Sequence, residues 1–302
     1  MKKDLLSVYD LDRNDVGVIF DNAAKLKKFQ QEGKTYTPLR GKTLGMIFDK
    51  SSTRTRISFE VGMYQLGGVA LFLSSRDTQL GRGESISDTA RIMSRYLDGI
   101  MIRTYSQELV EEFASHATIP VINGLTDREH PCQILSDIFT IIEKKGSFAG
   151  LKIAYIGDGN NIANSWIYAA ARLPLHLSLA CPEGYEPDKH ILEKGTREAE
   201  MGITIHRDPV DAVRDADVVY TDVWTSMGQE AEQEERKRVF RNYQINEALL
   251  AHARKDVMVM HCLPAHRGEE ITAEIMDGPQ SVVIDQAENR LHVQKAIMEI
   301  LL

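Results

Sequence analysis

The sequence predicts an α/β protein of two domains, each a parallel sheet flanked by helices. Short runs rich in Val, Ile, Leu and Phe alternate with helical patterns along almost the whole chain, which is typical of βαβ units. The chain has 302 residues, of which 43% are hydrophobic, and this is enough for two separate cores. Two lysines, a glycine and a serine at 144–147 end the longest helical pattern of the first half. We therefore expect a first domain at 1–145 and a second domain at 146–285.

In the first domain, strand patterns and helix patterns follow one another in turn. After an apolar run, Phe59, Met63 and Leu66 recur at helical spacing. Ser85 and Asp88 have the spacing of a helix-capping box. We expect strands at 42–49, 69–74, 99–104 and 120–124, and helices near 52–67, 85–97, 106–117 and 131–145.

The second domain restarts the same alternation. We expect strands at 151–156, 176–180, 203–206, 217–223, 257–262 and 281–284, and helices at 162–172, 188–201, 209–216, 244–253 and 286–301. The segment 227–243 is rich in Glu, Lys and Arg, which indicates a mobile loop with some helix. In folds of this class ligands bind at the carboxyl ends of the parallel strands, so polar residues just after strands are candidates for the site.

Composition argues against several kinds of partner. The formal net charge is −8 at pH 7, which disfavours a general basic attraction for nucleic acid. No stretch approaches the roughly 20 apolar residues of a membrane helix, and acidic residues interrupt the N-terminal region where a signal peptide would need an apolar core. Cys132, Cys181 and Cys262 cannot all pair and lack metal-ligand spacing. We expect a cytoplasmic protein with no metal, membrane or nucleic-acid partner.

The most informative segment is 52–56, which reads Ser-Thr-Arg-Thr-Arg at a predicted junction of strand and helix. The first turn of a helix has unpaired N–H groups and the positive end of the helix dipole, and both favour an anion. Arginine and hydroxyl side chains add donors that suit phosphate oxygens. A simpler interpretation is that Ser52 caps the helix and Arg56 pairs with Glu60. We favour a phosphate or carboxylate site over capping alone.

Further polar clusters come just after predicted strands. They begin at Arg103, His130, Gly157, Asp222 and His261. Each cluster is weak evidence alone. Together with the segment 52–56 they are hard to explain as random surface polarity, because ligands of such folds bind at this edge.

His130 precedes Pro131, which suits the first position of a helix. The histidine is either a cap or buried ring, or it works with Gln133 as a donor to a carbonyl group. Cys132 is better explained as a small apolar residue packed behind them. Cys262 is either a core residue at a strand end or a thiol that faces the site beside neighbouring histidines.

Gly157 and Gly159 follow a strand and precede a helix, as in a dinucleotide-binding fingerprint. However, Ile162 stands where the third glycine belongs, so NAD binding is disfavoured. Asn161 is better explained as a helix cap or as an amide donor to a small polar ligand.

Asp222 offers a carboxylate for an ammonium group at the end of a strand. Ser226 and the backbone N–H groups near Met227 offer donors to a carboxylate of the same molecule. Together they indicate a site for an α-amino acid. The alternative is structural: Asp222 caps a turn and Gly228 forms one.

Taken in order, these motifs resemble those of the ornithine carbamoyltransferases. They read Ser-Thr-Arg-Thr-Arg at 52–56, His-Pro-Cys-Gln at 130–133, Gly-Asp-Gly-Asn-Asn at 157–161, Asp-Val-Trp-Thr-Ser-Met-Gly at 222–228 and His-Cys-Leu-Pro at 261–264. The likeness runs from about residue 5 to 300. It implies an N-terminal carbamoyl phosphate domain, a C-terminal ornithine domain, and a last helix, 286–302, that packs back on the first domain. It also implies a homotrimer with active sites at subunit interfaces, and no cofactor.

The resemblance implies a role for each matching residue. For carbamoyl phosphate the implied contacts are Ser52, Thr53, Arg54, Thr55, Arg103, His130, Pro131, Cys132, Gln133, Cys262, Leu263 and Arg290, with Gln79 supplied by a neighbouring subunit. For ornithine they are Asn161, Asp222, Ser226 and Met227. The implied catalytic residues are Arg103, His130 and Cys262.

The implied reaction is attack by the neutral δ-amine of L-ornithine on carbamoyl phosphate, which gives L-citrulline and phosphate, as in arginine biosynthesis. Sister enzymes that act on putrescine, N-acetylornithine or aspartate would share the phosphate residues. The segment 222–228 favours ornithine, because it offers groups for both an α-ammonium and an α-carboxylate. A non-catalytic amino-acid-binding protein would leave the segment 52–56 and Arg103 without a function.

Overall fold

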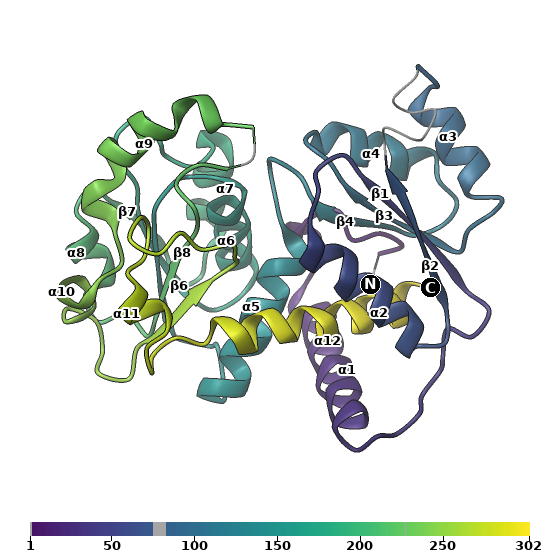
Figure 1. The fold of residues 1–302 in the computed structure, drawn as a ribbon, viewed down its shortest axis with the longest axis horizontal. Helices are drawn as coiled ribbons and strands as arrows, with labels where there is room; N and C mark the ends of the chain where they lie inside the picture. Colours follow the sequence, from purple (N-terminus) through teal and green to yellow (C-terminus); the bar gives the residue numbers. More distant parts are fainter. Residues whose placement is uncertain (1, 75–82, 227) are drawn as a thin grey trace. The chain divides into compact units, whose positions relative to one another are not determined.

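The structure, a computed structural model, describes residues 2–74, 83–226 and 228–302. The chain forms two compact units, one made of Met1–Phe139 with Glu288–Leu302 and the other of Thr140–Ala287. Each unit contains one parallel sheet with helices on both faces (Figure 1). The predicted fold class is therefore confirmed. No helix among the described residues is long and apolar enough to cross a membrane.

The sheet of the first unit has the strand order β2-β1-β3-β4, and all its strands are parallel. Its strands are β1 (Thr43–Phe48), β2 (Val69–Ser74), β3 (Gly99–Arg103) and β4 (Val121–Leu125). The chain runs outward from β1 in both directions, so the order reverses between β1 and β3. Loops that leave the carboxyl ends of two such strands diverge to opposite faces and leave room for a ligand between them.

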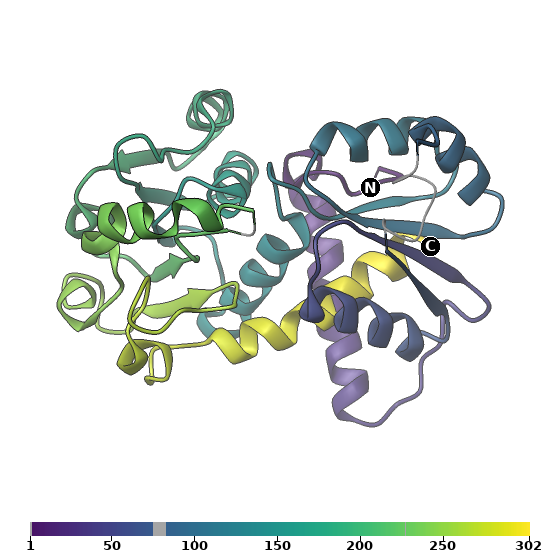
Figure 2. The same ribbon diagram turned by 45° about the horizontal axis from the view of Figure 1, so that its top comes forward.

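Helices cover both faces of this sheet. They are η1 (Val8–Asp10), α1 (Arg13–Gln31), α2 (Thr53–Gln65), α3 (Ile86–Met93) and α4 (Gln107–His116), together with parts of α5 (Pro131–Lys145) and α12 (Val283–Leu301). Figures 1 and 2 show α3 and α4 on one face, and α1, α2 and the end of α12 on the other. In α12, Lys295 Nζ donates to Gln30 of α1 at 2.9 Å and to Gln65 of α2 at 2.8 Å. The last helix therefore packs on the first unit, as expected.

The sheet of the second unit has the order β7-β6-β5-β8-β9, again all parallel. Its strands are β5 (Lys152–Ile156), β6 (His176–Ala180), β7 (Ile203–His206), β8 (Val218–Thr221) and β9 (Met258–His261). Here the order reverses between β5 and β8. The loops after β5 and β8 are therefore the ones expected to form a site.

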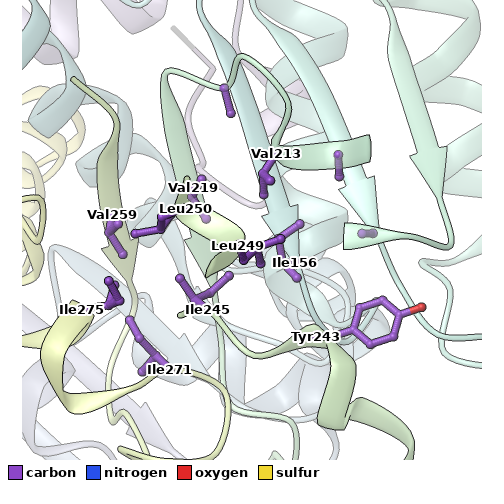
Figure 3. Packing of buried hydrophobic residues seen from close by; sticks show 14 of the residues in the cluster. Ile156, Val213, Val219, Tyr243, Ile245, Leu249, Leu250, Val259, Ile271 and Ile275 are labelled. Carbon is purple, nitrogen blue, oxygen red and sulfur yellow. The ribbon is translucent and has the colours of Figure 1, made fainter. Parts of the chain in front are cut away.

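The α-helices of the second unit range in length from 12 residues to four residues. The helices of this unit are α6 (Asn161–Arg172), α7 (Lys189–Glu198), α8 (Pro209–Val213), η4 (Glu230–Glu232), α9 (Gln233–Phe240), η5 (Arg241–Tyr243), α10 (Glu247–Leu250) and α11 (Ala273–Met276). Figure 3 shows side chains of the sheet, including Ile156 and Val259, packed against Leu249 of α10 and Ile275 of α11. This apolar cluster holds the short helices in place, which is necessary because helices of about one turn are not stable alone.

Several expected elements differ from the structure. The strand expected at 281–284 is wrong: Ser281 makes only an isolated bridge to Val259, and Val283 begins α12. The helix expected at 244–253 shortens to the four residues of α10. No helix was expected at α1, although Asp12 and Asp15 form a capping box at its start. Part of the segment expected as a loop with some helix is helical: residues 230–243 form η4, α9 and η5.

Gly159 and Gly17 allow a test of the packing. A methyl group at Gly159 would overlap the backbone of Glu186 and Pro187, whereas one at Gly17, inside α1, meets nothing within 4 Å. Gly159→Ala should lower the free energy of unfolding by about 1–3 kcal/mol, because backbone atoms cannot rotate away. Gly17→Ala should raise it by about 0.5–1 kcal/mol. Urea denaturation checks both, and equal midpoints for the two variants would contradict the packing at Gly159.

Candidate active site

In the first unit, the site begins at the turn between β1 and α2. Ser52 caps α2: its Oγ accepts from the Thr55 N–H at 3.2 Å and donates to Thr55 Oγ1 at 3.1 Å. The capping interpretation of Ser52 is thus confirmed. Arg56 pairs with Glu60 at 2.9 Å on the exposed side of the helix. The cap still leaves the remaining first-turn N–H groups available to an anion.

The first turn of α2 carries Arg54 and is met by a second arginine from a distant part of the chain. Arg290 of α12 donates to Thr55 Oγ1 at 2.8 Å, and both side chains are buried. The Nε atom of Arg54 is buried and has no hydrogen-bond partner among the described residues. A buried guanidinium N–H without an acceptor is costly, so an acceptor from a ligand would be favourable here.

Arg103 is the last residue of β3 and pairs in register with Phe48 at the end of β1. It is buried, and its Nε donates to the backbone carbonyl of Lys50 at 3.2 Å. Lys50 itself forms an ion pair with Asp127, in the loop after β4. The end of β1 thus connects Arg103 with the loop that leads to α5.

His130 lies directly before α5, in agreement with Pro131 as the first helical residue. Burial lowers the pKa of His130 well below its usual value, and the positive charges of Arg290, Arg103 and Arg54 lower it further. These three arginines are therefore close enough to act on one imidazole ring. At neutral pH the ring is uncharged, and a neutral imidazole can donate a hydrogen bond to a carbonyl oxygen.

Gln133 and Cys132 occupy the first turn of α5. Gln133 Nε2 donates to Asp137 at 2.8 Å, while its Oε1 is buried and has no hydrogen-bond partner among the described residues. The amide oxygen thus remains available as an acceptor. Cys132 is fully buried, points its Sγ at the carbonyl of Asn123, and has its pKa raised to about 12 by burial. The thiol is a packing residue, as expected.

In the second unit, a second cluster joins the loops after β5, β8 and β9. Asn160 Nδ2 donates to Asp222 Oδ2 at 2.8 Å, and the Cys262 thiol donates to Asp222 Oδ1 at 2.8 Å. The cap of α6 is Asn160, which accepts from the N–H groups of Ile162 and Ala163. The expectation of a cap at Asn161 is therefore wrong by one residue. Cys262 contacts a carboxylate, so it is not simply a core residue.

A buried pair supports the turn after β9. His261 Nε2 lies 3.1 Å from Glu270 Oε1, and both side chains are fully buried. His261 Nδ1 accepts from the backbone N–H of Leu263 at 2.9 Å. The ring therefore carries its proton on Nε2 and faces Glu270 rather than Cys262.

A buried ion pair attaches α9 to the loop after β5. Arg236 lies 3.1 Å from Asp158, and its NH1 donates to the carbonyl of Trp224 at 2.9 Å. Burial raises the pKa of Asp158 to about 6, although Arg236 opposes this shift. Ser226 follows two residues after Trp224, and its backbone N–H donates to Gln229. The pair thus restrains the segment on which Ser226 lies.

Gln79 and Met227 lie outside the described residues. Three residues with structural roles in the clusters were missed from the sequence: Asn160, Lys50 and Arg236. Only Asn160 had a local signal, because asparagine is a preferred N-cap.

Among the described residues, Asp222, His261 and Cys262 bring possible metal-ligand atoms within 4.8 Å of one another. All three are already engaged: Asp222 accepts from Asn160, and His261 pairs with Glu270. His266, Glu269 and Glu270 form a second such group, in which Lys237 pairs with Glu269 at 3.0 Å. A cation at this group would have to compete with the lysine ammonium.

Comparison with known proteins agrees along the whole chain. Residues 3–143 match the family model "Aspartate/ornithine carbamoyltransferase, carbamoyl-P binding domain", and residues 149–301 match the "Asp/Orn binding domain" of the same family. An ornithine carbamoyltransferase of Syntrophus aciditrophicus is 75% identical over 302 residues, which is 100% of both chains. The structure of ornithine carbamoyltransferase from Pyrococcus furiosus has 54% identity and a TM-score of 0.94, covering 98% of this chain and 95% of its own. An anabolic ornithine carbamoyltransferase from Campylobacter jejuni has 40% identity and a TM-score of 0.92, covering 99% of both chains.

Proposed function

This chain belongs to the aspartate/ornithine carbamoyltransferase family, and it is an enzyme that transfers the carbamoyl group of carbamoyl phosphate to L-ornithine. We propose that the cluster in its first unit binds carbamoyl phosphate and that the cluster in its second unit binds ornithine. The observation that carries this assignment is the hydrogen bond of Arg290 to Thr55 Oγ1 in the first turn of α2, where the buried Nε of Arg54 has no acceptor among the described residues. The positive charges of Arg54, Arg103 and Arg290 also help to lower the pKa of His130. Buried guanidiniums beside a helix N-terminus suit a phosphate dianion.

In this proposal the first turn of α2 holds the phosphate. Ser52, Thr53, Arg54 and Thr55 supply N–H, hydroxyl and guanidinium donors, with Arg103 and Arg290 on the same group. His130 donates to the carbamoyl carbonyl oxygen. The unpartnered Gln133 Oε1 accepts from the carbamoyl NH₂, which is consistent with the direction of the amide. Pro131 and Cys132 contribute through the backbone of the first turn of α5, because the Cys132 thiol packs against Asn123.

Asp222 receives the α-ammonium of ornithine, replacing hydrogen bonds that Asn160 and Cys262 donate to it in this structure. Asn161, Ser226 and Met227 serve the α-carboxylate. Cys262 and Leu263 lie beside the reacting amine and the carbamoyl group.

The δ-amine, in its neutral form, attacks the carbonyl carbon. The N–C bond forms, the C–O bond to phosphate breaks, and the departing phosphate takes up the proton that the amine loses. Arg103, His130 and the Thr55 hydroxyl stabilise the oxyanion of the tetrahedral intermediate, where one donor is typically worth about 2.7–4 kcal/mol.

The metabolic direction of the reaction, the cellular location of the enzyme and its oligomeric state remain predictions from the sequence. We propose that the enzyme works in arginine biosynthesis in the cytoplasm, and the likeness to the anabolic enzyme of Campylobacter jejuni supports the direction.

We also propose a homotrimer in which Gln79 completes the site of a neighbouring subunit. In support, exposed apolar side chains gather on α2 and the edge strand β2, namely Ile57, Tyr64, Val69, Leu71 and Phe72. Such an exposed edge is usually covered by a partner.

Arg54→Ala tests the phosphate site. The change should lower kcat about 10²–10³-fold, since it removes a donor to the leaving group, without altering the fold. Arg56→Ala, which removes the exposed pair with Glu60 on the same helix, is the matched control and should stay within about threefold. Citrulline formation measures both. Near-normal turnover of Arg54→Ala would contradict the phosphate assignment.

Asp222→Ala tests the ornithine site. It should raise KM for ornithine about a hundredfold, because the α-ammonium loses a buried carboxylate partner. Carbamoyl phosphate binding, measured by calorimetry, should be unchanged. Loss of carbamoyl phosphate binding instead would mean that the roles of the two units are reversed.

The choice of substrate is tested with the parent enzyme. Putrescine, N-acetylornithine and aspartate, assayed in parallel, should each be carbamoylated more slowly than ornithine.

Leu71→Glu tests the assembly. A charge on β2 should dissociate the trimer, because an unpaired carboxylate cannot be buried in an apolar contact. Met201→Glu is the control, since both side chains are 43% exposed but Met201 lies in the second unit. Sedimentation velocity gives the mass of each variant. A trimeric mass for Leu71→Glu would exclude β2 from the interface.

A further inference from the structure

The position of His130 depends on a short turn, residues 126–130, between β4 and α5. The Thr126 N–H donates to the Glu129 carbonyl at 2.8 Å, and the Glu129 N–H donates back to Thr126 Oγ1 at 3.1 Å. The turn is thus closed by two hydrogen bonds directly before His130. Any shift of Glu129 is passed to the histidine, because the two are neighbours in the chain.

Glu129 is a buried acidic residue with no role in the two clusters described above. Its side chain is only 2% exposed. Its Oε2 accepts from Ser7 Oγ at 2.8 Å and from the Val8 N–H at 3.1 Å. A residue next to His130 is therefore attached to the N-terminal segment.

That segment is itself fixed to the sheet. The Leu5 N–H donates to the Val121 carbonyl at 2.9 Å, and the Asn123 N–H donates to the Leu5 carbonyl at 2.8 Å. Residues 4–8 thus cover the outer edge of β4, which is the edge strand of its sheet. A group bonded to Ser7 and Val8 is held against a rigid element.

Burial favours the neutral form of Glu129. It is the main cause that raises the pKa of this carboxyl to about 8; the donors at Ser7 and Val8 oppose the shift, Asp10 of η1 adds to it, and Arg128 opposes it. At pH 7 the carboxyl is therefore mostly protonated. The carbonyl oxygen of a neutral acid still accepts both hydrogen bonds.

We propose that Glu129 is a positioning residue for carbamoyl transfer, which holds the turn 126–130 against Ser7 and Val8 and so fixes the ring of His130. The proposal rests on the role proposed above for His130. A displacement of about 1 Å in a catalytic group can lower a rate about 10²-fold. The expected effect is therefore on kcat rather than on ornithine binding.

Three variants separate positioning from a general loss of stability. Glu129→Ala should lower kcat about 10–100-fold, with KM for ornithine within twofold of the parent. Glu129→Gln should retain kcat within about threefold, because the amide oxygen accepts the same two bonds. Glu111→Ala, which removes an exposed partner of Arg128, is the control and should match the parent. If Glu129→Ala does not fold, Ser7→Ala replaces it and should lower kcat by a smaller factor, since the Val8 bond remains.

The pH profile gives a readout that simple destabilisation would not produce. Above pH 8 the parent carries a buried anion at Glu129, beside Asp10, whereas Glu129→Gln stays neutral. The ratio of kcat for Glu129→Gln to kcat for the parent should therefore rise between pH 7 and pH 9. The neutral Glu129 contributes fully to stability below its unfolded pKa of about 4.5, and this contribution is lost as the pH rises to its folded pKa of about 8. The Tm of the parent should therefore fall relative to that of Glu129→Gln between about pH 4.5 and pH 8.

Each remaining outcome overturns the proposal. Unchanged kinetic constants in Glu129→Ala, with only a lower Tm, would make the residue purely structural. Equal losses in Glu129→Ala and Glu129→Gln would show that accepting the two hydrogen bonds is not sufficient. Arg54→Ala distinguishes failure of the proposed active site from failure of the positioning role of Glu129. If Arg54→Ala is impaired while Glu129→Ala is normal, only the role of Glu129 is wrong. If Arg54→Ala is also normal, the proposed site itself is wrong.

Discussion

The site depends on one constraint, the parallel pairing of strands whose order reverses within each sheet. Pairing of Phe48 with Arg103 aligns the ends of β1 and β3, and pairing of Ile156 with Thr221 aligns the ends of β5 and β8. Polar residues just past these ends are therefore brought together without any direct attraction between them. The hydrogen bond from Arg103 to the Lys50 carbonyl and the bond from Asn160 to Asp222 both cross these reversal points.

Repulsion between positive charges governs the chemistry of the first cluster. Three guanidiniums that act on one buried ring place like charges near one another. Burial, and then these positive charges, lower the pKa of His130 and keep its ring neutral. Since the whole chain has a net charge of −8, the positive potential exists only locally. An anion bound there relieves the repulsion, and the neutral imidazole then remains as a hydrogen-bond donor.

The second cluster has the opposite character. Asp222 is a buried carboxylate whose two oxygens accept from an amide and a thiol, both neutral groups. A cationic ligand would interact with it more strongly than either neutral donor. The ion pair of Arg236 with Asp158 attaches α9 to the loop that also carries Asn160. The opposite charges of the two clusters agree with the roles proposed for them, one for an acyl phosphate and the other for an amino acid.

The sequence by itself determined the fold class, the strands that form the two sheets and the polar residues at their ends, because apolar runs and capping residues are local properties. It also identified the cap at Ser52 and the packing of Cys132. It could not place Asn160 on Asp222, Arg290 on Thr55 or Glu129 on Ser7, since each pair is far apart in the chain and no pattern connects its members. The strand expected at 281–284 is wrong for a different reason. A short apolar stretch suits either a strand or a helix, and packing in the folded chain decides between them. Only the tertiary structure shows which buried polar groups meet, because their distances in space are set by how the strands and helices pack together.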